Sequence, residues 1–341
     1  MPVSSSALTR PVAAPAEAPS RRAFLAAGAA QASAAQTRPA RPRISCGSFN
    51  FHTFGAKQDP EPAIDLIGQI GFEGIELILL TREDIQGYWT GPRIAAINRK
   101  LDRYKLEVAQ FILFQPVVEG LTSLDRAVRD QNLAYFEAGC KIGRQLRAPM
   151  VNIVAPWPRE WKGPQAYLPR YFDLENPKPG EKFHIDIAPG FDWDAVWANF
   201  AGAIKECLAR AKAHGMKLSI EHHTHTMIPD VASFLRLWDA IRDPALGYNL
   251  DTGWTASHRD YPPAAIHKVK RHLMNLHVRD IDGLMRRFVH IGEGVMDFRA
   301  IAQALKAIGF SGFLTLEQDK HPGDMQATAR RYLAMMKEYL G

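Results

Sequence analysis

Four segments of the chain each end in a side chain that can bind a metal ion. They read LSIE, YNLD, MNLH and LTLE, and they end in Glu221, Asp251, His277 and Glu317. Three carboxylates around one imidazole would repel one another without a cation, and this donor set suits a divalent ion with open coordination positions. We expect one Mn²⁺, with Co²⁺, Mg²⁺, Fe²⁺ or Zn²⁺ as alternatives. The competing interpretation is that ion pairs merely tie these strand ends together.

The four segments share the alternation of β-strands. The residues two positions before each end are small and polar, namely Ser219, Asn249, Asn275 and Thr315, and the residues between are Ile220, Leu250, Leu276 and Leu316. Because strand side chains alternate between two faces, each segment turns a polar pair to one side and an aliphatic residue to the other. The pattern predicts polar pairs facing inward and aliphatic residues facing a helix layer.

Several residues near these ends are candidates for binding a substrate. In LSIEHHTHT, residues 218–226, alternation places His223 on the face of Glu221 and His222 on the opposite face. We therefore expect Glu221 to be the ligand, His222 to be structural, and His223 to bind substrate or support the metal site. Trp254 offers a stacking surface or a packing role. Arg279 and His290 are further candidates, although His290 also fits a surface loop.

Strand-like runs alternate with helical stretches along the rest of the chain. The eight runs cover residues 43–51, 72–80, 106–114, 149–157, 216–223, 246–254, 273–280 and 312–319. Eight strands alternating with helices predict an α/β fold, a single (β/α)8 TIM barrel whose active site lies at the carboxyl ends of the strands. A doubly wound sheet would carry a glycine-rich turn after its first strand, and FNFHTFGAKQ is not such a turn.

Residues 156–190 break this alternation. They are rich in proline and aromatic residues and show no helical period. A connection of this length in a compact domain is generally functional. We expect an insertion after the fourth strand that covers the barrel mouth as a lid over a carbohydrate, or else an oligomer contact.

The first 40 residues resemble an export signal. Arg21 and Arg22 precede Phe24, Leu25, a weakly apolar Ala/Gly run and the small-residue site 32–34. This order resembles a twin-arginine signal, which exports folded proteins, and the apolar run is too short to span a bilayer. The pattern predicts a periplasmic protein whose barrel is residues 41–341, with no membrane attachment after cleavage. The alternative is a disordered leader with a chance arginine pair.

Charge and cysteine content exclude other classes. The formal net charge is +6, yet no block of five like charges occurs, which argues against a nucleic-acid partner. Cys46, Cys140 and Cys207 are far apart and lack a C-x-x-C spacing. Neither a disulfide framework nor a zinc knot is indicated, so we expect core cysteines.

These motifs together resemble a known superfamily. The order Glu, Asp, His, Glu on four successive strands, with GFEGIEL at residues 71–77 and IGEGVMDF at residues 291–298, is similar to the xylose-isomerase-like sugar isomerase/epimerase group. That group includes ketose 3-epimerases, inosose dehydratases and endonuclease IV, and the resemblance covers roughly residues 43–341. It implies that Glu221, Asp251, His277 and Glu317 bind the metal. It further implies that Glu221 and Glu317 exchange protons with opposite faces of a substrate carbon through a metal-stabilised enediolate.

The chain differs from particular members of this superfamily in two places. The epimerases and inosose dehydratases commonly read Asp-Thr-x-His on the sixth strand, where this chain reads Asp251-Thr252-Gly253-Trp254. This weakens the epimerase assignment. Endonuclease IV requires further zinc-binding histidines, and the corresponding places here read Trp254, FILFQP and residues 286–290. Most of its second and third metal sites is therefore missing.

The sequence thus predicts a divalent-metal-dependent sugar isomerase or epimerase. Because sugar phosphates belong to the cytoplasm, we expect a free or glycosidic keto-sugar as substrate. A lyase or dehydratase that carries out β-elimination on a 3-keto-glycoside or inosose is the second candidate. A non-catalytic periplasmic sugar-binding protein is the alternative from another class, and formation of a homo-oligomer is left open.

Overall fold

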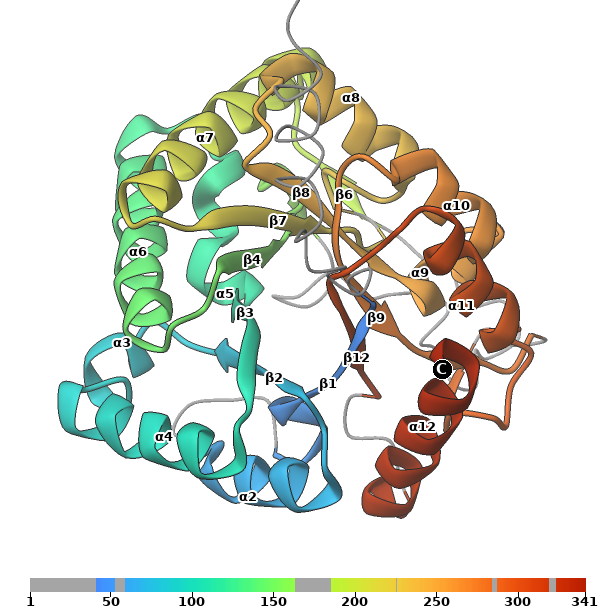
Figure 1. Cartoon of the computed structure of the whole chain (residues 1–341). Coiled ribbons are helices and arrows are strands. Elements are labelled where there is room, and N and C mark those ends of the chain that lie inside the picture. The colour runs from blue at the N-terminus through green and yellow to red at the C-terminus, as the bar shows by residue number, and fades with distance from the viewer. Residues whose placement is uncertain (1–40, 53–58, 163–184, 225, 284–286, 319–322) are drawn as a thin grey trace, which may run out of the picture. The chain divides into compact units, whose positions relative to one another are not determined.

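Eight parallel strands close into a barrel, as the sequence predicts (Figure 1). The computed structural model describes residues 41–52, 59–162, 185–224, 226–283, 287–318 and 323–341. Around the barrel the strands are β1 (Arg43–Gly47), β12 (Phe313–Leu316), β9 (Leu273–Val278), β8 (Leu246–Asp251), β7 (Lys217–Glu221), β4 (Met150–Val154), β3 (Glu107–Leu113) and β2 (Gly74–Leu79). All carboxyl ends therefore meet at one end of the barrel.

Helices connect the strands and lie outside them (Figure 1). The longer ones are α2 (Glu61–Ile70), α4 (Gly91–Tyr104), α6 (Arg126–Gln145), α7 (Trp193–Ala213), α8 (Val231–Ile241), α10 (Pro262–Val269), α11 (Phe298–Ala307) and α12 (Met325–Leu340). Shorter turns are η1 (Ser48–Asn50), α3 (Asp84–Gly87), α5 (Gln115–Val118), η2 (Glu119–Thr122) and α9 (Thr252–Ser257).

Aspartate residues start five of the long helices. Their carboxylates accept backbone N–H groups of the first turn, which have no partner within the helix. These residues are Asp125 before α6, Asp192 before α7, Asp230 before α8, Asp297 before α11 and Asp324 before α12. The sequence therefore specifies where these five helices begin.

The main hydrophobic core lies between the barrel and the helices. The four aliphatic residues predicted to face outward, Ile220, Leu250, Leu276 and Leu316, are all fully buried in it. The three cysteines are also buried, as predicted, and none forms a disulfide. Burial of this apolar layer leaves the inside of the barrel free to hold polar groups.

Between β4 and α7 the chain forms a short antiparallel pair, β5 (Trp161–Lys162) with β6 (Asp186–Ile187). Trp161 stacks on Trp193 at the start of α7, with ring centroids 6.2 Å apart. Residues 163–184 lie outside the described residues, so the lid expected over 156–190 stays a prediction.

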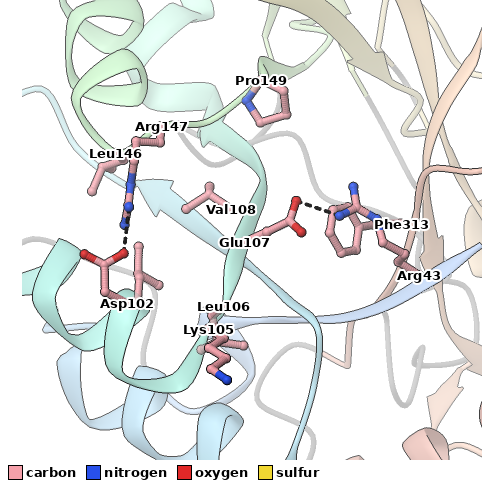
Figure 2. A pocket seen from close by; sticks show the side chains of 11 residues that line it. Arg43, Asp102, Lys105, Leu106, Glu107, Val108, Leu146, Arg147, Pro149 and Phe313 are labelled. Carbon is pink, nitrogen blue, oxygen red and sulfur yellow. Dashed lines mark hydrogen bonds and ion pairs between the residues drawn. The ribbon is translucent and has the colours of Figure 1, made fainter.

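A cavity of about 480 Å³ lies at the opposite end of the barrel from the four strand-end residues (Figure 2). Arg43 at the start of β1 pairs with Glu107, and Arg147 pairs with Asp102, so the charges that line it are largely matched. The cavity lies at the amino ends of the strands, and in this fold residues at that end contribute to stability.

The predicted export signal, residues 1–40, lies outside the described residues. Within the part of the chain that the structure describes, no helix is both long enough and apolar enough to cross a bilayer.

Candidate metal centre

The structure brings the four predicted metal-binding side chains together. Each of Glu221, Asp251, His277 and Glu317 offers one donor atom, and these atoms lie within 4.8 Å of one another. All four side chains are buried. They come from the carboxyl ends of β7, β8, β9 and β12, and strand register aligns Asp251 with His277. The four neighbouring strand ends therefore build one site.

His277 lies at the centre of this cluster. Its Nδ1 atom lies 3.3 Å from Glu221 Oε1 and also contacts Glu317, and its Nε2 atom lies 2.8 Å from Glu76 Oε2. Burial by itself would lower the pKa of His277, but the negative charges of Glu317, Glu76 and Glu221 outweigh it and raise this pKa well above its usual range. The site therefore strongly favours a positive charge at this position.

Glu221 stays ionised inside the barrel. Burial alone would raise its pKa, but the charge of His277 and the hydrogen bond from His223 hold this pKa well below its usual range. His223 Nε2 lies 3.3 Å from Glu221 Oε1, and Asn249 Nδ2 donates to Glu221 Oε2 at 3.1 Å. An ionised, oriented carboxylate can bind a cation or accept a proton.

Arg279 pairs with two of the four residues. It is 1% exposed, its Nε donates to Asp251 Oδ2 at 2.7 Å, and its Nη2 contacts Glu317. Burial nevertheless leaves the pKa of Asp251 above its usual range, because the charge of Arg279 offsets the burial and the repulsion by Glu221 only in part. The predicted substrate-binding residue Arg279 thus lies directly at the carboxylates.

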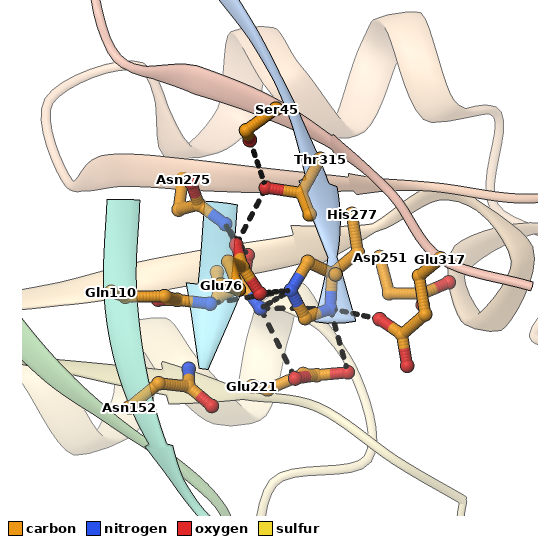
Figure 3. Close-up of polar contacts among 12 residues, drawn as sticks. Ser45, Glu76, Gln110, Asn152, Glu221, Asp251, Asn275, His277, Thr315 and Glu317 are labelled. Atoms are coloured by element: carbon orange, nitrogen blue, oxygen red, sulfur yellow. Dashed lines mark hydrogen bonds and ion pairs between the residues drawn. The ribbon is translucent and has the colours of Figure 1, made fainter. Parts of the chain in front are cut away.

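A layer of polar side chains lies inside the barrel next to the cluster (Figure 3). It contains the four residues predicted to face inward, Ser219, Asn249, Asn275 and Thr315, all fully buried. Ser219 Oγ donates to Gln110 Oε1 at 2.9 Å, and Thr315 Oγ1 donates to Glu76 Oε1 at 2.5 Å. The inward-facing prediction is confirmed.

Gln110 and Glu76 were missed by the sequence analysis. Both come from the other side of the barrel, β3 and β2, and both contact His277, Gln110 through its Nε2 atom at 3.2 Å from His277 Nε2. The available signal was a single polar residue inside each of the otherwise apolar runs GIELILL and VAQFILF. Such a residue has to find a polar partner inside the fold.

The histidines that follow Glu221 separate as predicted from alternation. His222 is buried outside the barrel, 3.3 Å from Thr255 Oγ1 and stacked on Tyr248. Burial lowers the pKa of His222 to about 3, so it is a neutral core residue. His223 instead lies against Glu221 and Trp254, with a ring separation of 4.5 Å from the latter.

Trp254 is fully buried and also contacts Phe288 edge-on, with ring centroids 4.9 Å apart. His290 is 8% exposed and its Nδ1 lies 2.6 Å from Thr328 Oγ1 of α12. The expectation of a surface position for His290 was therefore wrong, because α12 packs over this loop. Whether Trp254 or His290 contacts substrate stays a prediction.

The motif IGEGVMDF follows the short pair β10 (Asp280–Ile281) and β11 (Phe288–Val289). Asp280, adjacent to Arg279, accepts the backbone N–H groups of Gly292, Gly294 and Met296 at 2.9 to 3.1 Å, in addition to that of Ile281. The motif thus wraps around one buried carboxylate that the sequence analysis did not single out.

An apolar cluster lies on the side of the barrel mouth opposite the carboxylates. This separate cluster joins the ends of β1, β2 and β3 and consists of Phe49, Ile78, Leu80 and Ile112, with Phe114 packed against it. Phe49 lies edge-on to His277, with ring centroids 6.5 Å apart. The four candidate metal-binding residues thus come from the other side, formed by β7, β8, β9 and β12.

The donor set fits a divalent ion. Four buried carboxylates, those of Glu76, Glu221, Asp251 and Glu317, face one fixed positive charge among the described residues, that of Arg279. His277 and His223 add positive charge only when they are protonated. Buried charges are costly unless they are paired. A cation among the carboxylates would supply the missing positive charge, and oxygen donors with one imidazole suit Mn²⁺ and its neighbours.

Comparisons with known proteins agree with the barrel fold. The model of the family described as xylose isomerase-like TIM barrel matches residues 64–339. An inosose dehydratase of Lacticaseibacillus casei is 23% identical over 177 residues, which cover 47% of this chain and 58% of the relative, less than two thirds of its length.

Two solved structures share the fold. A D-psicose 3-epimerase superposes with a TM-score of 0.67 at 18% identity, covering 88% of this chain and 99% of the other. The 3-keto-D-glucoside 4-epimerase of E. coli gives a TM-score of 0.64 at 16% identity, covering 87% and 100%. At these identities the likeness shows the fold alone.

Proposed function

Because the chain belongs to the xylose isomerase-like TIM barrel family, we propose that it is a metal-dependent sugar isomerase or epimerase. Its substrate in this proposal is a free or glycosidic keto-sugar. The observation that carries the proposal is the buried cluster of Glu221, Asp251, His277 and Glu317 at the carboxyl ends of four barrel strands. The names of the similar proteins, sugar epimerases and an inosose dehydratase, support the same class of substrate.

These four side chains would hold one divalent ion, with Mn²⁺ as the first choice and Co²⁺, Mg²⁺, Fe²⁺ or Zn²⁺ as alternatives. When bound, such an ion makes a C–H group beside a carbonyl more acidic by drawing electrons from the carbonyl oxygen. Arg279 stays within hydrogen-bonding distance of Asp251 and limits the repulsion among the carboxylates.

Glu221 and Glu317 are the proposed catalytic pair. One carboxylate removes the proton next to the carbonyl, which leaves the substrate as an enediolate, and the other returns a proton to a carbon of it. The low pKa of Glu221 keeps it in the form that accepts a proton. In this proposal His223 and Arg279 orient substrate oxygens, and the support is their contact with Glu221 and Glu317 respectively. Trp254 and His290 are retained as further substrate-binding proposals.

Elimination is the second candidate. In β-elimination a base removes the same proton, and a group on the next carbon leaves with its bonding electrons and takes up a proton. The similarity to an inosose dehydratase favours this reaction. His223 beside Glu221 offers a proton donor for the leaving group.

The test is proton exchange in D₂O. Purified protein is stripped with a chelator, reloaded with Mn²⁺ and incubated with a panel of keto-sugars, and NMR follows deuterium uptake at substrate carbons. We expect uptake in the wild type, and a loss of about 10²-fold or more in Glu221→Gln and Glu317→Gln with sugar affinity largely kept. The matched control Glu338→Gln changes an exposed side chain of α12 and should behave as the wild type.

The products separate the candidates. An epimer or isomer keeps the mass of the substrate, whereas elimination releases a leaving group. Absence of exchange on every sugar, with sugar affinity retained by the wild type, would contradict both reactions and favour the non-catalytic binding protein.

We also propose export by the twin-arginine route to the periplasm. The support is the order of residues around Arg21 and Arg22. Replacing both by lysine should leave the full-length precursor in the cytoplasmic fraction, whereas unchanged fractionation would contradict the proposal.

A further inference from the structure

Glu76 is a buried carboxylate that the proposed reaction does not use. It lies in β2, on the other side of the barrel from β9, and it is fully buried. Among the described residues, its cationic partner is His277, at 2.8 Å. A carboxylate buried this deeply is costly unless its oxygens accept several hydrogen bonds.

Three side chains meet this requirement (Figure 3). Glu76 Oε1 accepts from Asn275 Nδ2 at 2.8 Å and from Thr315 Oγ1 at 2.5 Å, and Oε2 faces His277 Nε2. Thr315 Oγ1 in turn lies 2.7 Å from Ser45 Oγ of β1. Glu76 is therefore held from β9 and β12 directly, and Ser45 of β1 supports Thr315.

This arrangement determines which ring nitrogen of His277 faces the carboxylates of Glu221 and Glu317. The Nε2 atom points at Glu76, and the Nδ1 atom points at Glu221 and Glu317. A neutral imidazole carries its single proton on one nitrogen only. With that proton on Nε2 and donated to Glu76, the lone pair of Nδ1 faces the metal-binding cluster.

The same carboxylate is connected to a second ligand. Asn275 Nδ2, which donates to Glu76, also lies 3.0 Å from Asn249 Oδ1, and Asn249 Nδ2 donates to Glu221 Oε2 at 3.1 Å. Asn275 donates from its nitrogen to both neighbours, whereas Asn249 accepts with its oxygen and donates from its nitrogen. The chain of hydrogen bonds from Glu76 thus orients Glu221 as well as His277.

We propose that Glu76 is a positioning residue of the metal centre. It accepts the Nε2 proton of His277, fixes Nδ1 as the metal-binding atom, and through Asn275 and Asn249 holds the Glu221 carboxylate in place. The inference rests on the proposed function, because it requires the four-residue cluster to bind a metal. Partners that orient metal-binding histidines commonly change metal affinity by about 10-fold to 100-fold.

The experiment measures metal affinity rather than turnover. Wild type, Glu76→Gln and the matched control Glu107→Gln, an exposed glutamate at the start of β3, are stripped and titrated with Mn²⁺ in a calorimeter. Co²⁺ absorption then reports the geometry of the site. We expect Glu76→Gln to bind Mn²⁺ about 10-fold to 100-fold more weakly and to change the Co²⁺ spectrum. The control should match the wild type.

A double-mutant cycle separates positioning from a general structural role. If Glu76 acts through His277, then Glu76→Gln should cost much less affinity in a His277→Asn background than in the wild type. Equal losses in both backgrounds would overturn the inference. So would a folded Glu76→Gln protein with wild-type affinity and spectrum.

A second variant tests the inference if Glu76→Gln does not fold. Thr315→Val removes one donor to Glu76 without changing volume, and a loss of affinity of about 5-fold is expected because the lost bond is to a charged group. Wild-type affinity in Thr315→Val would overturn the inference in that case. Absence of metal binding by the wild type would instead overturn the proposed function, and this inference with it.

Discussion

Arg279 supplies the fixed positive charge at the barrel mouth. Its guanidinium is fully inside the protein and contacts Asp251 and Glu317, whereas the charge of His277 depends on protonation. Guanidinium groups stay protonated at all working pH values. Arg279 should therefore matter most when no metal ion is present.

Replacing Arg279 by methionine tests this role. Removal of one partner from a buried ion pair typically costs about 3–5 kcal/mol, so chelator-treated Arg279→Met should unfold at lower denaturant concentration than the wild type. Addition of Mn²⁺ should restore more stability to this variant than to the wild type, as measured by urea unfolding. The control Arg299→Met breaks an exposed pair with Glu338 and should cost at most about 1 kcal/mol. Equal losses in the two variants would contradict this role.

The cysteines give a second prediction at this scale. Burial raises the pKa of Cys46 and of Cys140 to about 12, and that of Cys207 well above its usual range. In the folded protein all three should resist a thiol reagent such as DTNB at pH 8 and react only after unfolding. Above about pH 9 the unfolded chain ionises these thiols first, so stability should fall as the pH rises toward 12. Rapid reaction of a thiol in the native protein would contradict their burial.

At the scale of elements, one loop depends on a single carboxylate. A Cβ atom at Gly294 would overlap with Asp280 Oδ1 and with the carbonyl oxygen of Ile281. The hydrogen bonds of Asp280 to residues 292–296 require this close approach. Glycine at position 294 is therefore needed for the IGEG loop to close beside Arg279.

Gly294→Ala should consequently destabilise the protein by about 1–3 kcal/mol, because overpacking displaces buried groups. Gly202→Ala is the matched control: it lies in α7, where an added Cβ meets nothing within 4 Å, and alanine there should stabilise by about 0.5–1 kcal/mol. Urea unfolding of both variants measures the difference. Equal stability of the two would show that the loop tolerates a side chain.

The sequence predicted the elements well because their signals are local. Alternation in LSIE, YNLD, MNLH and LTLE places ligands and aliphatic residues on opposite faces, and the structure agrees for all four strands. Glu76 and Gln110 could not be assigned in the same way. Their partner His277 lies 201 and 167 residues further along the chain. Which residues meet across a barrel depends on the stagger of its strands, and no single segment of the sequence determines that stagger.

For the whole molecule, the closed barrel has two ends with different contents. The carboxyl ends gather the ligands on β7, β8, β9 and β12, while the amino ends hold a cavity whose charges are largely paired (Figure 2). Two further predictions, the insertion over 156–190 and the export signal of residues 1–40, depend on residues that lie partly or wholly outside the described part of the chain. The central claim rests on the barrel mouth alone.

That claim is one divalent ion per chain, held by Glu221, Asp251, His277 and Glu317. Elemental analysis of gently purified wild type, beside the double variant Glu221→Ala/Asp251→Ala, tests it most directly. We predict about one equivalent of Mn, Co, Fe or Zn in the wild type and none in the double variant. No metal in the wild type, or two to three equivalents of zinc, would contradict the mononuclear site.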